Sequence, residues 1–188
     1  MSDPAASVPD MDTTTFWELL ELSRHETADQ DERSEWLTAE LAGRPPGDVA
    51  DFQIHLDTAR EQVDTWHLWA AAHLLCGGCS DDGFHYFQAW LIGLGHAGCT
   101  RITADPDALA DVVLAADETP EWESLDYVAP EAYRLITGEP DGLDTALLAR
   151  GHQVKGGPQP TGEGWDLDDP AEQARRLPRL SAAVHVTT

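Results

Sequence analysis

Apolar positions recur at helical spacing along most of the chain. Between Val49 and His73 they advance in alternating steps of three and four residues, which is the spacing of one helix face held over about seven turns. The polar pair Asp64-Thr65 interrupts this run, so residues 48–76 predict either one long helix or two. No segment alternates apolar and polar residues as a half-buried strand does. The pattern therefore predicts an all-α protein.

The remaining helices follow from capping residues, glycines and prolines. A capped helix is expected after Asp12, where Thr15 and Glu18 have capping-box spacing, and a second over Ala28 to Ala42. Further helical segments are expected over residues 80–94, 105–114 and 122–136. The expected fold is a single-domain orthogonal bundle of about six or seven helices with a loop-rich C-terminal segment. Its centre is expected in residues 66–75 and 84–94.

Changes in composition divide the 188 residues into four parts. Residues 1–11 are polar with two prolines and predict a disordered arm. Residues 12–138 form the expected helical core domain. Residues 139–164 include a stretch rich in glycine and proline, which predicts a flexible linker or lid. Residues 165–188 are expected to dock back on the core as a C-terminal segment.

A region of low charge stands out inside this acidic chain. From Trp66 to Thr100 there is no Lys or Arg, and Asp81 and Asp82 are the only carboxylates. Charged side chains are seldom buried without a partner, so this region predicts the core. The two carboxylates inside it therefore need an explanation.

Asp81 and Asp82 have two interpretations. Ser80 is a good helix N-cap, and acidic residues in the first turn are stabilised by the helix dipole by about 0.3–1 kcal/mol. The functional hypothesis makes them a carboxylate pair at the mouth of an aromatic-lined pocket, acting as general base, metal ligand or cation binder. Gly83 would keep the turn slim enough for a ligand to approach.

Histidines and aromatic residues surround this turn in the sequence. His67 and His73 lie in the apolar helix, where they are either hydrogen-bonded core groups or partners of Asp81 and Asp82 in a carboxylate–imidazole dyad. The candidate catalytic residues are accordingly Asp81, Asp82, His73 and His67. The candidate ligand-binding residues are Trp66, Trp69, Ser80, Gly83, Phe84, His85, Tyr86 and Trp90. The seven tryptophans of the chain are alternatively large core side chains, since most fall on helical stripes.

Cys76 and Cys79 form a C-x-x-C pair with His73 and His85 nearby. These four side chains nominally suffice for a tetrahedral metal site, although all of them would straddle one tight turn. No second C-x-x-C exists, and Cys99 is isolated. We therefore expect buried thiols and no metal or other cofactor, with a divalent metal or a redox dithiol as the alternatives.

Charge and cysteine content limit the partners. The 35 Asp and Glu residues outnumber the 11 Lys and Arg residues and give a formal charge of −24. Such a surface repels phosphate groups, which argues against nucleic acid and anionic membrane partners. No apolar run reaches the roughly 18 residues of a membrane helix. Three cysteines and the lack of a secretory signal predict a soluble cytoplasmic protein. A monomer or a homodimer is expected.

Several blocks of the chain share a pattern with one known family: Thr15–Leu19, Trp66–Ala71 with its Trp-x-x-Trp spacing, Gly77–Ile92 with Gly-Gly-Cys-Ser-Asp-Asp-Gly-Phe, Asp105–Ala110, and Trp165–Asp169 with Leu177–Leu180. Through these residues the chain resembles an uncharacterised bacterial family, frequent in actinobacteria. It implies a cytoplasmic single domain and no established activity.

Three functions remain open at this point. The favoured one is a helical binding or accessory protein that holds a small molecule or partner protein near residues 80–87. The first alternative is an enzyme that uses Asp81 or Asp82 with a nearby histidine, with or without a metal. The second alternative is an acidic immunity-type protein that neutralises a basic partner.

Overall fold

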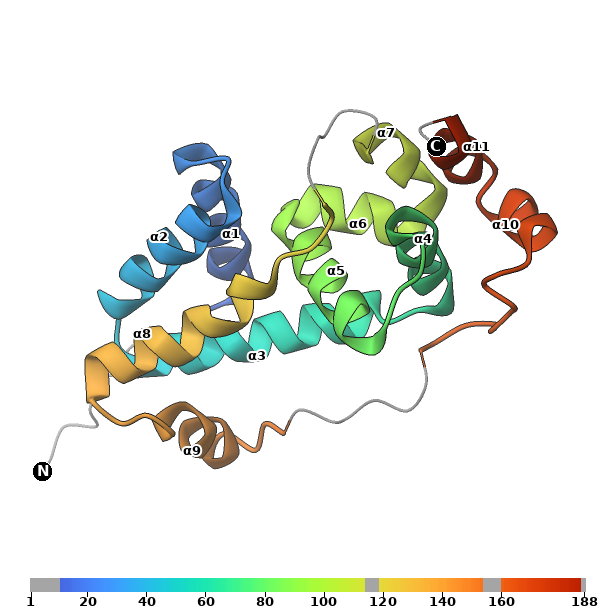
Figure 1. Cartoon of the computed structure of the whole chain (residues 1–188). Coiled ribbons are helices and arrows are strands. Elements are labelled where there is room, and N and C mark those ends of the chain that lie inside the picture. The colour runs from blue at the N-terminus through green and yellow to red at the C-terminus, as the bar shows by residue number, and fades with distance from the viewer. Residues whose placement is uncertain (1–10, 114–118, 154–159, 187–188) are drawn as a thin grey trace, which may run out of the picture. The chain divides into compact units, whose positions relative to one another are not determined.

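The computed structural model of the chain describes residues 11–113, 119–153 and 160–186, and its regular structure is almost entirely helical (Figure 1). The α-helices are α1 (Thr13–Glu26), α2 (Gln30–Ala42), α3 (Pro46–Val63), α4 (Trp66–Cys76), α5 (Asp81–Gly93), α6 (His96–Ala104), α7 (Leu109–Val113), α8 (Val128–Thr137), α9 (Gly142–Ala149), α10 (Pro170–Arg176) and α11 (Pro178–Val186). Two 3-10 helices, η1 (Pro106–Ala108) and η2 (Glu123–Tyr127), precede α7 and α8. Among the described residues, β-structure is limited to one isolated bridge between Thr65 and Thr161. The predicted all-α class is confirmed.

The long apolar stripe of residues 48–76 forms two helices. α3 ends at Val63 and α4 begins at Trp66, so the chain breaks at the polar pair Asp64-Thr65. The Thr65 hydroxyl accepts a hydrogen bond from the Leu68 amide at 3.1 Å and caps α4. A capping threonine satisfies an amide that the first helical turn leaves without a partner. The break is therefore a consequence of local side-chain chemistry.

Three helix starts differ in detail from the sequence expectation, although α1 begins directly after Asp12 as expected. Asp12, and not Thr15, caps α1, because its carboxylate accepts from the Thr15 amide at 2.8 Å. α2 begins at Gln30 behind the cap Asp29, two residues later than expected. Asp105 makes no side-chain capping bond, and Pro106 opens a short 3-10 helix in place of the first turn of an α-helix. In each case the first good acceptor or proline decides where the helix starts.

The described residues hold eleven α-helices, more than the six or seven expected. α6 was not anticipated because its nine residues offer few apolar positions, of which Cys99 and Ile102 are buried. α9 lies within residues 139–164, and its Leu143 and Leu147 are buried. In the C-terminal segment Pro178 separates α10 from α11, since proline cannot continue a helix. Residues 1–10 of the expected arm and residues 154–159 of the expected lid lie outside the described residues.

The chain divides into two compact units. The first comprises Met1–Asp57 with Asp126–Val154, and the second comprises Thr58–Leu125 with Lys155–Thr188. In the first unit α2 packs against both α1 and α8. Its core contains Phe16, Leu20, Leu37, Leu41, Phe52 and Leu56, all fully buried.

A buried arginine ties α2 to α1 in the first unit. Arg33 is 8 % exposed, and its Nε donates to the Ser23 hydroxyl at 3.1 Å. Ser23 in turn donates to the Leu20 carbonyl at 2.8 Å. A buried cation must find acceptors, so these bonds fix how the two helices meet.

The second unit contains α4 to α7, α10 and α11. α11 packs against α4, α7 and η1, and α5 packs against α6. Fully buried aromatic and aliphatic side chains form its core, among them Trp122, Phe87, Leu68, Leu91, Ile92 and Ile102. The Trp122 amide donates to the Tyr86 carbonyl at 3.0 Å, which joins the segment before η2 to α5. No helix in the described part of the chain combines the length and apolar character needed to cross a bilayer.

Candidate functional site

The predicted site is the turn between α4 and α5, and glycine makes this turn possible. Gly77 has φ 65° and ends α4 in the left-handed region, where only glycine is unstrained. The amides of Gly77 and Gly78 both donate to the His73 carbonyl. The Ser80 hydroxyl then accepts from the Gly83 amide at 3.1 Å and caps α5. Both ends of the turn are thus satisfied without the acidic side chains.

Asp81 and Asp82 are exposed in the first turn of α5. Their carboxylates take part in no hydrogen bond or ion pair with any described residue. Ser80 alone supplies the capping oxygen, so the aspartates contribute through the helix dipole and leave their oxygens to solvent. A Cβ on Gly83 would meet the Ser80 hydroxyl at 3.4 Å and the Cys79 sulfur at 3.5 Å, which is ordinary contact. The turn itself therefore has room for a Cβ at this position.

The histidines of α4 bind the C-terminal segment and not the aspartates of the turn. His73 Nε2 lies 2.9 Å from Asp168 Oδ1, and His67 Nε2 lies 3.3 Å from the Arg176 carbonyl oxygen. Each Nε2 thus contacts an acceptor about a hundred residues further along the chain, and the structure shows no hydrogen bond between these two imidazoles and Asp81 or Asp82. His85, in α5, packs edge-on against Tyr86 with ring centroids 6.0 Å apart.

The candidate aromatic residues form a continuous stack. Trp66 contacts Trp69, Trp69 stacks on Phe84 with centroids 4.5 Å apart, and Phe84 continues through Phe87 to Trp90. Phe84, Phe87 and Trp90 are buried. Each of these rings packs against another ring. The aromatic side chains therefore form core packing between α4 and α5. Trp66 and Trp69 remain partly exposed at its end.

The thiols beside the turn are protonated at neutral pH. Burial raises the pKa of Cys79 to about 11, with further contributions from Cys76, Glu121 and Asp81. Burial and Glu121 also raise the pKa of Cys76. A thiolate is the form that binds metal or attacks disulfides. Among the described residues no group of three or more His, Cys, Asp or Glu side chains is placed to hold a metal ion.

The C-terminal segment lies along α4 through backbone contacts. The Trp66 amide donates to the Thr161 carbonyl at 3.0 Å, and the Thr161 amide donates to the Asp64 carbonyl at 2.9 Å. Gly164 lies so close to the Trp66 indole that a Cβ there would be 3.2 Å from Cε2. The start of α4 is therefore partly covered by residues 161–164.

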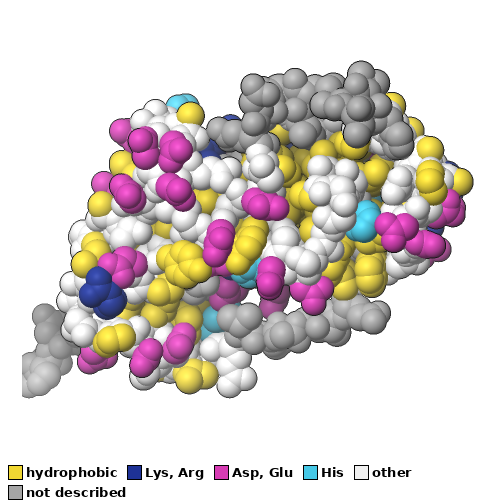
Figure 2. All heavy atoms as spheres, viewed as in Figure 1, with side chains coloured by type: hydrophobic (Ala, Val, Ile, Leu, Met, Phe, Trp, Pro, Cys, Tyr) yellow, Lys and Arg dark blue, Asp and Glu magenta, His cyan; other side chains and the backbone are white. Residues whose placement is uncertain are grey.

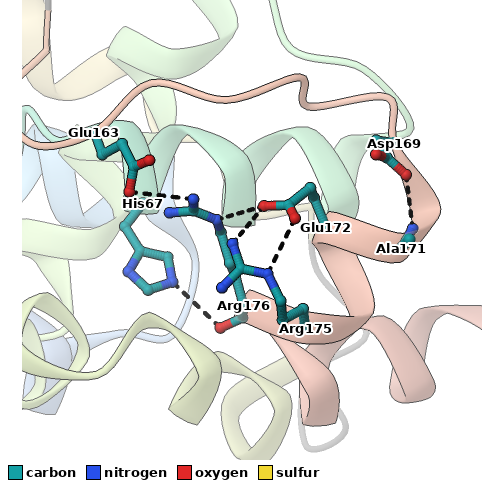
Figure 3. A network of polar contacts seen from close by, with 7 residues as sticks. All are labelled: His67, Glu163, Asp169, Ala171, Glu172, Arg175 and Arg176. Atoms are coloured by element: carbon teal, nitrogen blue, oxygen red, sulfur yellow. Dashed lines mark hydrogen bonds and ion pairs between the residues drawn. The ribbon is translucent and has the colours of Figure 1, made fainter.

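Arg176 holds this segment together, as Figure 3 shows. Its guanidinium lies 5.3 Å from the centre of the Trp165 ring, and pairs with Glu172 at 2.8 Å and Glu163 at 3.2 Å. Its carbonyl is the acceptor for His67. One residue thus connects the loop, α10 and α4.

Glu172 and the cap of α10 complete the network in Figure 3. Hydrogen bonds from Arg175 and Arg176 lower the pKa of Glu172 to about 2. The Asp169 carboxylate accepts from the Ala171 amide at 2.9 Å at the start of the helix. The carboxylates of α10 are therefore occupied, in contrast to those of the α4–α5 turn.

A remote carboxylate caps α11. Asp107 Oδ1 accepts from the amides of Arg179 and Leu180, both at 2.9 Å. Arg179 also pairs with Asp111 through its side chain. Leu177 and Leu180 are fully buried beside these contacts. A helix start has unpaired amides, and here η1 supplies the acceptor that the local sequence lacks.

A second imidazole–carboxylate pair was not anticipated from the sequence. In the first unit His152 Nε2 lies 2.8 Å from Asp57 Oδ2, and Gln53 Nε2 donates to the other oxygen of Asp57 at 2.8 Å. Nearby, Arg150 Nε donates to Asp51 Oδ1 at 3.1 Å. The only sequence signal is that Asp57 falls next to Leu56 on the buried side of α3. His152 follows α9 in a glycine-rich stretch for which the sequence predicted a flexible linker or lid.

Comparisons with known proteins place the chain in a family. Residues 11–135 match the family described as "Protein of unknown function (DUF4240)". This match includes the α4–α5 turn and ends within α8, before the C-terminal residues on which the resemblance also rested. Neither the comparison with curated proteins nor the comparison with solved structures gave a match. Since the match covers more than half of the chain, the protein belongs to the DUF4240 family of proteins of unknown function.

Proposed function

We propose that this protein is a non-catalytic binding protein that docks a basic segment of a partner protein at the α4–α5 turn. The observation that carries the proposal is the state of Asp81 and Asp82. Both carboxylates are exposed, and neither accepts a hydrogen bond from a described residue, because the Ser80 hydroxyl caps the helix. Adjacent free carboxylates on a rigid helix start are suited to pair with Lys or Arg of a partner.

The surroundings of the turn favour binding over catalysis. The enzyme alternative pairs Asp81 or Asp82 with a nearby imidazole as acid and base, whereas His67 and His73 bind the C-terminal segment. The thiols are protonated, since the pKa of Cys79 is about 11. The aromatic rings pack on one another as core side chains do.

The charge of the whole chain supports a basic partner. A formal charge of −24 attracts cationic surfaces and accelerates their encounter at low ionic strength. Neutralisation of a basic toxin or nucleic-acid enzyme is one form that such binding would take. The three cysteines are free, as suits a protein that acts in the reducing cytoplasm.

The proposal is tested by affinity capture with the double variant D81N/D82N. We expect wild-type protein to retain a basic partner, and the double variant to lose most of it, in quantitative mass spectrometry of captured proteins. The control is E18Q/E21Q, which removes two exposed carboxylates of α1 and the same charge. The purified partner should then bind wild type with an affinity that falls as salt rises. Equal capture by all three proteins would refute a role for the turn.

A further inference from the structure

The large hydrophobic side chains exposed in the described chain are concentrated around α8. They are Leu22, Tyr127, Leu135 and Leu148, and all four belong to the first unit. Tyr127 lies at the start of α8, Leu135 near its end, and Leu148 in α9. Figure 2 shows hydrophobic side chains over α8 and α9 with acidic side chains among and around them. Exposed apolar groups gathered on adjoining elements, with a polar surround, are typical of a protein-binding surface.

α8 is strongly two-sided. Val128, Ala129 and Ala132 are buried, whereas Tyr127 is 60 % and Leu135 is 55 % exposed. Positions 127, 131, 134 and 135 share the outer side of a helix, because residues three and four apart are neighbours. The outer side of α8 therefore presents two large apolar groups about two turns apart. α9, which packs against α8, adds Leu148 at 59 % exposure.

The charges on this surface leave it acidic. Between the two apolar groups Arg134 binds Glu131 through both Nε, at 2.8 Å, and Nη2, at 2.5 Å. The charges of Arg134 and Glu131 therefore cancel each other. Glu139, Asp141 and Asp144 follow α8 and are exposed, and their carboxylates bind no described residue. The surface thus has apolar groups beside a negative border.

We propose that the outer side of α8, with Leu148 of α9, docks an amphipathic helix of a partner protein whose apolar side chains are flanked by Lys or Arg. Two apolar groups two turns apart match the anchor spacing of an amphipathic helix. The border of Glu139, Asp141 and Asp144 selects a basic sequence by charge complementarity. A second copy of this chain fits poorly, because a symmetric contact would bring the same acidic border against itself. This surface is independent of the α4–α5 turn.

The test is fluorescence anisotropy with a labelled synthetic peptide of about 18 residues that forms a Leu/Lys amphipathic helix. A second peptide carries Glu in place of every Lys. We expect saturable binding of the Lys peptide by the full-length protein and none of the Glu peptide. Leu135→Asp should weaken binding by about tenfold or more, as removal of a central anchor does. Tyr127→Ala should weaken it too, and serves as a second variant if Leu135→Asp disturbs folding.

Two controls make the result specific. Leu22→Asp places the same charge on another exposed leucine of the same unit, and should leave binding unchanged. E18Q/E21Q, which removes two exposed carboxylates of α1, should also leave it unchanged. Loss of binding in D81N/D82N without loss in Leu135→Asp would place the peptide at the α4–α5 turn and overturn this proposal, so that failure here is distinguishable from failure at the turn. If wild type, Leu135→Asp and Tyr127→Ala bind the Lys peptide equally well, the proposal is overturned. It is also overturned if Leu22→Asp weakens peptide binding as much as Leu135→Asp does. Self-association of wild type that Leu135→Asp abolishes would overturn it in favour of a second copy.

Discussion

Two imidazole–carboxylate pairs, one in each unit, have nearly the same geometry but different surroundings. His152 lies 2.8 Å from Asp57, and His73 lies 2.9 Å from Asp168. The imidazoles are similarly covered, at 18 % and 20 % exposure, but the Asp57 side chain is 9 % exposed and the Asp168 side chain 87 %. Asp57 also binds Gln53, and that second donor helps offset the cost of its burial. Distance alone therefore says little about what such a pair contributes to stability.

The largest effect is expected from Asp57→Ala. This change leaves the Gln53 amide and the His152 imidazole without their acceptor at a site where the Asp57 side chain is only 9 % exposed. We expect a loss of about 3 kcal/mol in the free energy of unfolding, as for other buried partners left unsatisfied. Urea denaturation followed by circular dichroism measures it. A loss below about 1 kcal/mol would show that water replaces the carboxylate easily, and that burial does not distinguish the two pairs.

Double-mutant cycles sharpen the comparison. The coupling between His152 and Asp57 should be about 2 kcal/mol, and that between His73 and Asp168 well under about 1 kcal/mol. Each cycle compares the two alanine variants and their combination by urea denaturation. Repeating both at high salt should reduce only the exposed coupling, since screening acts mainly on exposed charges. Equal couplings in the two units would contradict the argument from burial.

Asp107→Ala tests whether partial exposure always makes a contact weak. Asp107 is only half-buried, but it accepts from two amides at the start of α11. Loss of a helix cap costs about 1 kcal/mol, so we expect an effect between those of Asp57 and Asp168. Asp107→Asn is the control, because its amide oxygen retains one acceptor and should recover much of the loss. No change in either variant would show that water caps the helix as well as Asp107 does.

Short-range features of this fold could be predicted from the sequence, and long-range pairs could not. The Ser80 cap and the break at Asp64-Thr65 depend on residues within one helical turn, which a local pattern contains. The acceptors of His73 and His152 are each 95 positions away along the chain. Nothing in the local spacing identifies such partners, because they depend on where α3 and the C-terminal segment come to lie.

The candidate site shows the same division. The exposure of Asp81 and Asp82 follows from their place in the first turn of α5, which the sequence indicated. The histidines of α4 contact Asp168 and the Arg176 carbonyl through Nε2, and they make no hydrogen bond to Asp81 or Asp82. Nearness in the sequence suggested that His67 and His73 would contact Asp81 or Asp82, but residues of the distant C-terminal segment contact them instead. Burial of Asp57 likewise depends on tertiary packing and not on its immediate neighbours.

The smallest effect is expected from Asp168→Ala. Its carboxylate is mostly in water, so the pair with His73 is screened and gains little over hydration. We expect the free energy of unfolding to change by less than about 0.5 kcal/mol. Amide hydrogen exchange should nevertheless become faster in residues 161–176, because the segment loses one of its attachments to α4 while Arg176 still binds His67. Asp31→Ala, which removes an exposed carboxylate from α2 in the first unit, should leave that exchange unchanged. If Asp168→Ala destabilised the protein as much as Asp57→Ala, geometry and not burial would govern both pairs.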